Sequence, residues 1–449
     1  MNFTRRGILK SGLALGAGAA AGTLTRFGRL SALTPPSDDY RALVCVFLFG
    51  GNDSNNLIVP MDTAGYNAYA QIRKNLALAQ NTLLEVTTPT GAGYGLHPKL
   101  VELQSLFQSK NLAVVANAGT LVQPLSRDQY LKSPALAPVN LFSHADQQAE
   151  WQSSLPQGQA TTGWGGRLAD QMGHLNGGSP FPTLLSVAGN ALFADGTQSR
   201  PATVIPGAPL GLQGFDGSAA SQARTKALTQ LLSLNSGAQL VQQADLTMQQ
   251  GISNAAALAQ AFSGAPALQT QFPKSNLGAQ LLEIVKVIQV RKQLGMTRQI
   301  FFCSLGGFDT HTNQINDQDT LFTELSQALG AFYKATQELN VDGNVTTFTE
   351  SDFSRTLQPN TNGGTDHAWG SHHLVMGGMV KGGDVYGTFP TLALGGPNDA
   401  GAEGRWIPAI ATDQYGATLS KWFGLMPSLN SVVFPNIGNF PSVDVGFMA

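Results

Sequence analysis

The sequence predicts an α/β fold in which a doubly wound, mainly parallel sheet is sandwiched by helices and carries a helical insertion. The first observation is a series of short apolar runs, each ending in glycine or polar residues. Such continuous runs are typical of strands that are covered on both faces. The second is that patterns with apolar residues three and four positions apart, typical of helices, lie between the later runs. Alternating strands and helices indicate a mainly parallel sheet.

The predicted elements follow one another along most of the chain. The strands are expected within residues 41–53, 112–119, 181–189, 299–311 and 344–352. Helical patterns cover residues 277–295 and 321–339. Residues from about 190 to 275 are rich in Ala, Gln, Ser and Gly, and we interpret them as the helical insertion. The whole is expected to form one domain over residues 40–449.

Composition narrows the class of protein. The formal net charge is −2 and only 12% of the residues are charged, so no basic surface indicates a nucleic-acid partner. The two cysteines, Cys45 and Cys303, each lie in an apolar run and could form a disulfide or remain buried free thiols. No Cys/His spacing typical of a zinc site is present.

The N-terminus predicts export. Paired arginines, Arg5 and Arg6, precede an apolar stretch of small residues from Ile8 to about Leu24. This pattern is typical of a twin-arginine signal, here over residues 1–32, and makes the twin-arginine translocase a partner during export. The Gly- and Ala-rich stretch is too weakly apolar to serve as a stable membrane anchor after cleavage. The mature protein is therefore expected to be periplasmic or secreted.

The first polar cluster follows the first predicted strand, in the sequence FGGNDSNN. Ligands of open α/β sheets bind beyond the carboxyl ends of the strands. Asp53 is a candidate metal ligand there, and Asn56 a candidate ligand or oxyanion donor. Asn55 is better interpreted as the start of an Asx-turn.

A second cluster follows the strand expected at 299–311. Asp309 and His311 are two residues apart, so in an extended chain their side chains lie on the same face. A carboxylate and an imidazole on one face can hold a divalent cation or form an orienting hydrogen-bonded pair.

A third cluster, Ser143, His144 and Asp146, lies where a helix is expected to begin. A hydroxyl at a helix N-terminus is well placed for nucleophilic attack, because the backbone N–H groups favour an anion there. Ser143 is the candidate nucleophile, with a helix cap as the alternative.

The fourth cluster, residues 348–378, gathers acids, an arginine and three of the seven histidines between glycines. Asp352 ends a predicted strand, and Arg355 is a fitting partner for an oxyanion. A glycine-flanked loop presents Asp366 and His367 together. One of the next two histidines, His372 and His373, is expected to be structural, and the other is a candidate for the same site. The alternative for the whole cluster is a satisfied hydrogen-bond network.

These motifs, in this order, resemble the bacterial family of twin-arginine-exported proteins named DUF1501, a domain of unknown function. The resemblance is carried by FLFGGNDSNN, HPKL, FSHADQQAEWQ, GFDTH, SDFSRT and GTDHAWGSHHLVMGGMVKGG, together with the paired arginines. That family is similar to the alkaline phosphatase/sulfatase superfamily. The resemblance implies an alkaline-phosphatase-like fold and the use of one or two metal ions, with a hydroxyl nucleophile, to hydrolyse phosphate or sulfate esters.

The resemblance also implies roles for single residues. Ser143 resembles the nucleophile position, and Asp309 with His311 resembles a metal-binding pair, although at closer spacing than usual. Further positions that resemble metal ligands are Asp53, Asp352 and His367. Phe353 stands where the superfamily signature has a histidine, which favours a one-metal or degenerate site over two metals. The chain also has Asp352 where its own family is expected to have Glu.

Together these observations predict an exported, metal-dependent hydrolase of small-molecule or polysaccharide phosphate or sulfate esters. Ser143 is the expected nucleophile, and Arg355 and Asn56 are expected to stabilise developing charge. The alternative is a non-catalytic periplasmic or cell-surface protein that assembles or binds polysaccharide on the same fold. Zinc, calcium and manganese all remain candidates for the ion, and the expected metal ligands are Asp53, Asp309, His311, Asp352, Asp366 and His367.

Overall fold

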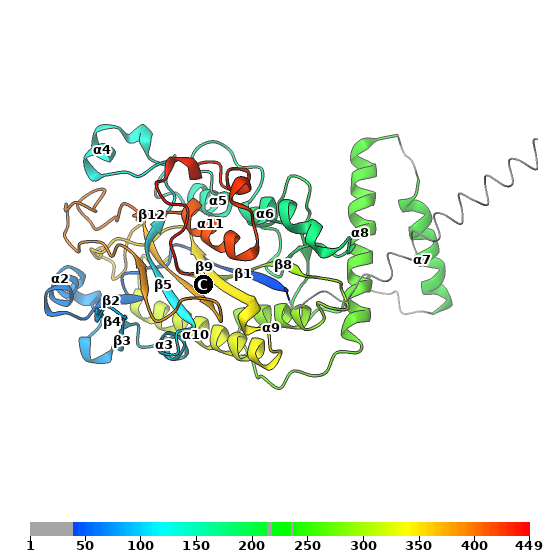
Figure 1. Ribbon diagram of the computed structural model, residues 1–449, viewed down its shortest axis with the longest axis horizontal. Helices are drawn as coiled ribbons and strands as arrows, with labels where there is room; N and C mark the ends of the chain where they lie inside the picture. The colour runs from blue at the N-terminus through cyan, green and yellow to red at the C-terminus, as the bar shows by residue number, and fades with distance from the viewer. Residues whose placement is uncertain (1–38, 213–217, 235–236) are drawn as a thin grey trace, which may run out of the picture. The chain divides into compact units, whose positions relative to one another are not determined.

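A nine-stranded sheet forms the centre of the computed structural model, which describes residues 39–212, 218–234 and 237–449 (Figure 1). Its strands lie in the order β11–β5–β10–β9–β1–β8–β6–β7, with β12 paired to β5. Their bounds are β1 Arg41–Phe49, β5 Leu112–Gly119, β6 Leu184–Ser186, β7 Ala202–Thr203, β8 Arg298–Gly306, β9 Val345–Ser351, β10 Ser371–Gly377, β11 Val385–Gly387 and β12 Ile410–Ala411.

The sheet is mainly parallel, as predicted. β1 pairs in parallel with both β8 and β9, and β6 continues the parallel order beyond β8. β10 is antiparallel to both of its neighbours, β5 and β9. A second sheet has the order β2–β4–β3, formed by Ile58–Pro60, Gly93–Leu96 and Leu84–Thr87.

Helices cover both faces of the large sheet, which confirms the doubly wound fold. Their bounds are α2 Thr63–Arg73, α3 Val101–Gln108, α4 Arg127–Lys132, α5 His144–Ser153, α6 Trp164–Met172, α7 Ala219–Leu232, α8 Gln239–Phe262, α9 Asn276–Gln289, α10 Gln314–Glu338, α11 Thr412–Phe423 and α12 Asn430–Val433. In Figure 1, α9 and α10 lie on one side of the sheet, and α5, α6 and α11 lie on the other.

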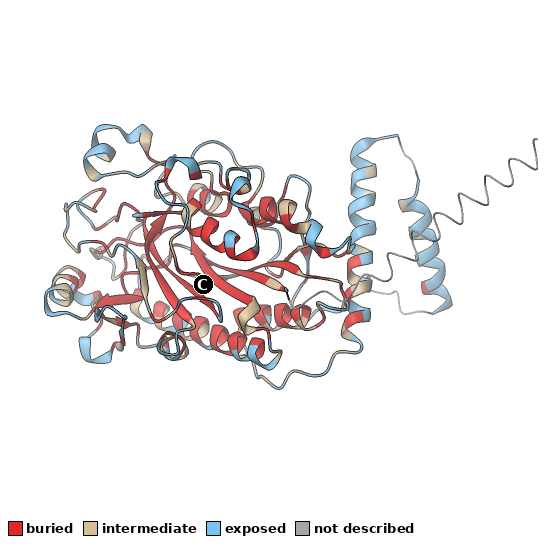
Figure 2. Ribbon diagram, in the orientation of Figure 1, coloured by how far each residue is buried: buried red, intermediate tan, exposed pale blue. Residues whose placement is uncertain are grey.

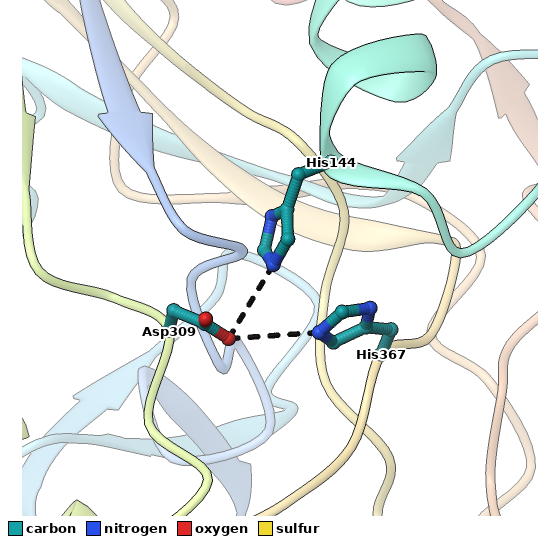
Figure 3. Close-up of side chains that lie close together, drawn as sticks. All are labelled: His144, Asp309 and His367. Carbon is teal, nitrogen blue, oxygen red and sulfur yellow. Dashed lines mark ion pairs between the residues drawn. The ribbon is translucent and has the colours of Figure 1, made fainter.

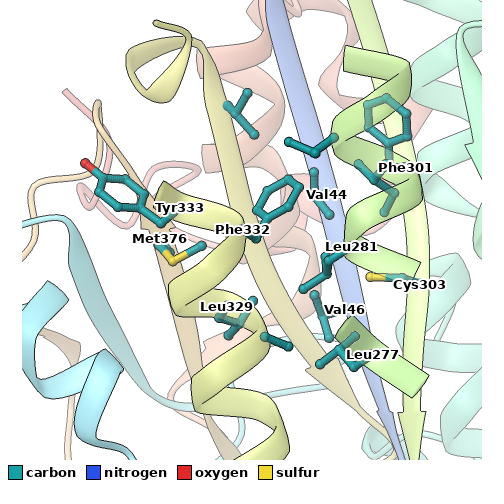
Figure 4. Packing of buried hydrophobic residues seen from close by; sticks show 14 of the residues in the cluster. Val44, Val46, Leu277, Leu281, Phe301, Cys303, Leu329, Phe332, Tyr333 and Met376 are labelled. Atoms are coloured by element: carbon teal, nitrogen blue, oxygen red, sulfur yellow. The ribbon is translucent and has the colours of Figure 1, made fainter. Parts of the chain in front are cut away.

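Alternate residues of each strand enter two separate cores. On β1, Val44 and Val46 pack with Leu277 of α9 and Phe332 of α10 (Figure 4), whereas Phe47 faces the core under α5, α6 and α11. This alternation follows from the two-residue repeat of a strand. Because both faces are covered, the central strands are buried along most of their length (Figure 2).

The same alternation keeps the cysteines apart. Cys45 belongs to the core beneath α5 and α6, whereas Cys303, on the neighbouring strand, belongs to the core beneath α9 and α10. Both are buried free thiols in the described part of the chain. The disulfide alternative is therefore wrong, because the two side chains lie on opposite faces of the sheet.

The helices of the predicted insertion are α7 and α8. α7 is largely exposed, and α8 contacts the core through Leu258 and Ala261 in its last turns (Figure 2). Residues Tyr40–Ala449 form one compact unit. The predicted export signal, residues 1–32, lies outside the described residues.

Candidate metal centre

The site lies beyond the carboxyl ends of three adjacent strands, β9, β1 and β8. The pairing aligns Phe49 with Gly306, and Leu48 with Ser351, so the three strands end side by side. Three segments that are far apart in the sequence therefore leave the sheet at the same edge. They carry three of the four clusters predicted from the sequence.

Gly50 allows the first two of these segments to touch. Its φ is +113°, a conformation that a residue with a side chain rarely adopts. A Cβ atom there would lie 2.4 Å from the backbone nitrogen of Asp309. The glycine after β1 thus sets the position of the segment after β8.

Three histidines converge on the Asp309 carboxylate. Its Oδ1 atom lies 3.4 Å from Nε2 of His144, 3.0 Å from Nε2 of His311 and 3.5 Å from Nε2 of His367. Figure 3 shows His144, from the start of α5, and His367 directed at Asp309 from different sides. The side chains of Asp309 and His311 are 49% and 41% exposed, so one side of this group is open to solvent.

Each of the three rings is held through its other nitrogen. Nδ1 of His144 lies 2.6 Å from Oδ2 of Asp352, and Nδ1 of His311 lies 3.1 Å from Oδ1 of Asp366. Nδ1 of His367 lies 2.7 Å from the carbonyl oxygen of Phe142. Carbonyl and carboxylate oxygens accept hydrogen bonds, so we assign the proton of each neutral ring to Nδ1. Each Nε2 atom then presents a lone pair to Asp309.

This arrangement fits a cation. Nε2 of His311 and Nε2 of His367 are only 2.9 Å apart, and with both protons on Nδ1 neither is a donor. Nε2 of His144 is buried and has no hydrogen-bond partner among the described residues. Lone pairs and a carboxylate facing one another are stabilised by a metal ion, and histidines held at Nδ1 are typical of metal ligands. Ligand atoms of His144, Asp309 and His367 lie within 4.8 Å of one another.

The electrostatics of the group favour an ionised Asp309 and a neutral His367. Burial opposes ionisation of Asp309, but Arg355 and the nearby histidines outweigh it and lower the pKa of Asp309. Burial also lowers the pKa of His367. The hydrogen bond to Asp352 raises the pKa of His144, so this ring binds a proton more readily than an isolated histidine.

The sequence match identifies the family. The model of a family described as "Protein of unknown function (DUF1501)" matches residues 40–399, which include every residue of this group. The chain belongs to the DUF1501 family. No curated protein matches the sequence.

Several solved structures are similar to this DUF1501 chain. They include Ps i-CgsB in complex with k-i-k-neocarrahexaose, with 12% identity and a TM-score of 0.34 over 89% of this chain and 77% of that chain. The C-terminal periplasmic domain of EcEptC from Escherichia coli, in complex with Zn, has 11% identity and a TM-score of 0.32 over 77% of each chain. The PsFucS1 sulfatase from Pseudoalteromonas sp. has 10% identity and a TM-score of 0.34 over 88% of this chain and 70% of that chain. Because these scores are low, the fold of the DUF1501 chain is assigned from its own sheet order.

Two predicted ligands, Asp352 and Asp366, contact the Nδ1 side of the histidine rings, away from Asp309. The Asp352 carboxylate is fully buried and accepts from His144, from Nε2 of Gln148 at 2.7 Å and from the backbone N–H of Gly50 at 3.1 Å. Asp366 binds Nδ1 of His311. Both carboxylates therefore orient imidazoles in the DUF1501 site rather than facing Asp309 themselves.

Asp53 and Asn56 lie in a different network. The Asp53 carboxylate forms an ion pair with Arg73 and also accepts from Gln314, and the three side chains are buried. The Asn56 amide donates to Gln318 at 3.2 Å and accepts from the Tyr69 hydroxyl at 2.8 Å. The structure does not bring either residue to the histidine group, because their polar atoms bind α2 and α10.

Arg355 is close to the group but is not available to a ligand. Its side chain is fully buried. Nη1 donates to Oδ1 of Asp309 and to the carbonyl oxygen of Gly50, each at 3.0 Å, and Nε and Nη2 donate to Thr365. In this arrangement the guanidinium fixes Asp309, and the role of Arg355 as an oxyanion partner stays a prediction.

Ser143 precedes α5, as expected, but its side chain does not cap the helix. Its hydroxyl donates to Oδ2 of Asp146 at 2.6 Å. The next residue, His144, is the ligand candidate that the sequence interpretation missed. The available signal was a histidine in the first turn of the helix that Ser143 precedes.

His372 and His373 lie on β10, inside the protein. Nδ1 of His372 accepts from the backbone N–H of Asn117 at 2.9 Å, and His373 contacts the Trp151 ring. Burial lowers the pKa of each to about 3. Both are therefore neutral core histidines, whereas the sequence interpretation required only one of the pair to be structural.

Proposed function

We propose that this DUF1501 chain is an exported, metal-dependent hydrolase of phosphate or sulfate esters, with one divalent ion held by His144, Asp309, His311 and His367. The observation that carries the metal site is the convergence of three Nε2 lone pairs on the Asp309 carboxylate. Compared with the ligands predicted from the sequence, the proposed ligand set adds His144. It leaves out Asp53, Asp352 and Asp366.

The donor set narrows the choice of ion. Three imidazole nitrogens and one carboxylate oxygen are typical of zinc and iron sites, whereas calcium prefers oxygen ligands only. Bound there, the ion would polarise the ester oxygen and lower the pKa of a bound water or hydroxyl. The exposed side of Asp309 and His311 leaves room for a substrate to approach.

The protein's own residues hold the site in one arrangement. Asp352 keeps the proton of His144 on Nδ1, and Asp366 does the same for His311. Arg355 fixes Asp309 and helps to keep it ionised. The choice of phosphate or sulfate esters is supported by the resemblance of the DUF1501 family to the alkaline phosphatase/sulfatase superfamily.

Export is proposed from the sequence. Arg5 and Arg6 head the apolar stretch typical of a twin-arginine signal. Among the described residues, no helix combines the length and the hydropathy that a membrane span requires.

The first test is elemental analysis of the mature protein, purified after export without a chelator or a metal-affinity tag. We expect roughly one equivalent of zinc or iron per chain. His144→Ala should lower the metal content strongly, because one ligand and the contact to Asp352 are lost together. The matched control is His174→Ala, which changes an exposed histidine whose Nδ1 is bonded to the carbonyl oxygen of Gln171. Metal-free wild-type protein that gains no thermal stability from added metal would contradict the metal site.

A second candidate function follows from Arg355 and Asn56. Both residues, expected to stabilise developing charge, are buried and bonded to protein. A non-catalytic periplasmic or cell-surface protein that assembles or binds polysaccharide would have no need of such groups. Bound metal with no turnover of aryl phosphates, aryl sulfates or sulfated polysaccharides would favour this candidate. Metal-dependent turnover that His144→Ala abolishes would favour the hydrolase.

A further inference from the structure

Phe142, two residues before α5 begins with His144, has an unusual backbone conformation. Its φ is +73°, in the left-handed region that aromatic residues rarely adopt. Its N–H is donated to Oε1 of Gln147 at 2.7 Å, and its carbonyl oxygen accepts from Nδ1 of His367 at 2.7 Å. Strained residues of this kind persist where the surroundings hold them, and they gather at functional sites.

Gln147 is the residue that holds Phe142 from the helix side. It is fully buried on α5, and its Oε1 atom is used by Phe142. Its Nε2 atom has no hydrogen-bond partner among the described residues. An apolar side chain would avoid this unsatisfied donor, so packing alone does not explain a glutamine at this position.

Arg405 holds the same pair of residues from the opposite side. Its Nε donates to the carbonyl oxygen of His367 at 2.9 Å, and its guanidinium carbon lies 4.9 Å from the centre of the Phe142 ring. Its own backbone N–H is bound by the buried Asp399 carboxylate at 3.0 Å. His367 is therefore restrained both at its backbone and, through the Phe142 carbonyl, at its ring.

We propose that Gln147 and Phe142 are positioning residues of the metal centre. Helix α5 supplies His144 as one ligand and, through Gln147 and the Phe142 carbonyl, fixes the tautomer and ring orientation of His367 as a second. Two ligands more than 200 positions apart in the sequence are thereby oriented by one helix. This inference rests on the metal site proposed above and adds the residues that set its geometry.

The test compares two glutamines of the same helix. Gln147→Met removes the acceptor that holds Phe142. Gln152→Met is the matched control, because Oε1 of buried Gln152 likewise accepts from a backbone N–H, that of Phe193 at 3.0 Å, away from the histidines. For each full-length mature protein, we would measure Co²⁺ affinity by competition with a chelator, the visible spectrum of bound Co²⁺, and the melting temperature of the metal-free form.

We expect Gln147→Met to weaken Co²⁺ binding by about 10- to 100-fold, the usual range for a residue that orients a ligand, and to change the Co²⁺ spectrum. Gln152→Met should leave both unchanged, even if it lowers the melting temperature as much. Gln147→Glu, which keeps an acceptor oxygen, should restore most of the affinity. It also serves as the second variant if Gln147→Met does not fold.

The outcomes separate the two proposals. Wild-type Co²⁺ affinity and spectrum in Gln147→Met, with a melting temperature lowered as in Gln152→Met, would show a merely structural role and overturn this inference alone. Equal losses of affinity in both variants would overturn it as well. Wild-type protein that binds no Co²⁺ would remove the metal site itself.

Discussion

At the scale of single residues, Ser143 offers a direct test of the chemistry. Its hydroxyl lies 2.6 Å from the Asp146 carboxylate, so Asp146 is placed to accept its proton. If Ser143 is the nucleophile, Ser143→Ala should abolish ester turnover and leave the metal content unchanged. Steady-state kinetics with elemental analysis on the same sample measures both. Unchanged kcat in the variant would remove Ser143 from the reaction and leave water as the attacking group.

Glu350 shows that an acid in the fourth cluster can have no part in the site. It is fully buried in the core, where it accepts from Nε1 of Trp164 at 3.0 Å, and no Lys or Arg of the described chain pairs with it. Burial raises the pKa of Glu350 from 4.5 to about 8. Folded protein therefore keeps a proton on Glu350 at pH values where unfolded protein has lost it.

The raised pKa of Glu350 makes the free energy of unfolding fall as the pH rises. The stability that the protonated Glu350 contributes is complete below about pH 4.5 and is lost as the pH rises towards 8, by an amount on the order of 4 kcal/mol. Glu350→Gln lacks this titration, so its free energy of unfolding should fall less over the same range. Urea unfolding of both proteins between pH 5 and pH 8.5 measures the difference. Parallel pH profiles would show that Glu350 is ionised in the folded protein.

At the residue scale, the sequence predicted most of the residues of the proposed site, but it did not predict which would face Asp309 and which would support the histidines from behind. It placed Asp309, His311 and His367 together, because each follows a strand that ends at one edge of the sheet. The sequence could not tell a metal ligand from a residue that supports one. Asp352 was predicted as a ligand, but it binds the ring of His144, 208 positions away, and His144 is the one that faces Asp309. Arginine is a common substrate-binding residue, so the sequence favoured that role for Arg355. Only the structure shows that its side chain is buried and paired with Asp309.

At the scale of elements, the turn after β1 sets the geometry of the site. Gly50→Ala should destabilise the fold by more than about 2 kcal/mol, because the added Cβ meets the backbone of Asp309 and the positive φ is strained. It should also weaken metal binding, because Asp309 must move. Gly306→Ala, at the end of β8, is the control, because a Cβ there meets no atom within 4 Å. Denaturant unfolding and metal titration would refute this role for the turn if both variants matched wild type.

Helix α10 shows where the element prediction fell short. Its apolar pattern begins at Leu321, but the helix begins at Gln314. The buried residues of its first two turns are glutamines. The amide of Gln314 donates to the Asp53 carboxylate, and the amide of Gln318 donates to the backbone carbonyl of Asp53. A helix that packs through hydrogen bonds has no apolar periodicity, so its start was invisible in the sequence.

At the scale of the whole molecule, the parallel sheet was predictable, but β10 was not among the predicted strands, and it runs antiparallel to both of its neighbours. β10 is short and buried like its neighbours, and the chain between Ser351 and Ser371 contains no crossover helix. An antiparallel neighbour needs no crossover, which accounts for the reversal. The absence of a helical pattern between residues 352 and 370 was the signal in the sequence that pointed to an antiparallel neighbour.

The export proposal also belongs to this scale. Replacing Arg5 and Arg6 together by Lys should leave the precursor in the cytoplasm, because the translocase recognises the arginine pair. Arg26→Lys, farther along the same signal, should be exported as wild type. Fractionation of cells with and without the translocase would measure the location of the protein. Export of the wild type in cells that lack the translocase would contradict the twin-arginine route.

The reversal of β10 has a consequence for how such a site can diversify. The chain leaves the sheet at the end of β9 and re-enters it at the start of β10, on the same edge. The segment between them is therefore a loop with both ends anchored in the sheet. Arg355 and His367 form a bridge across its base, and the tip at Thr361 and Asn362 is exposed. Insertions at that tip could lengthen the rim of the site while Asp352 and His367 stay in place. A library of insertions built at this tip can therefore vary which groups reach the centre while the centre itself stays unchanged.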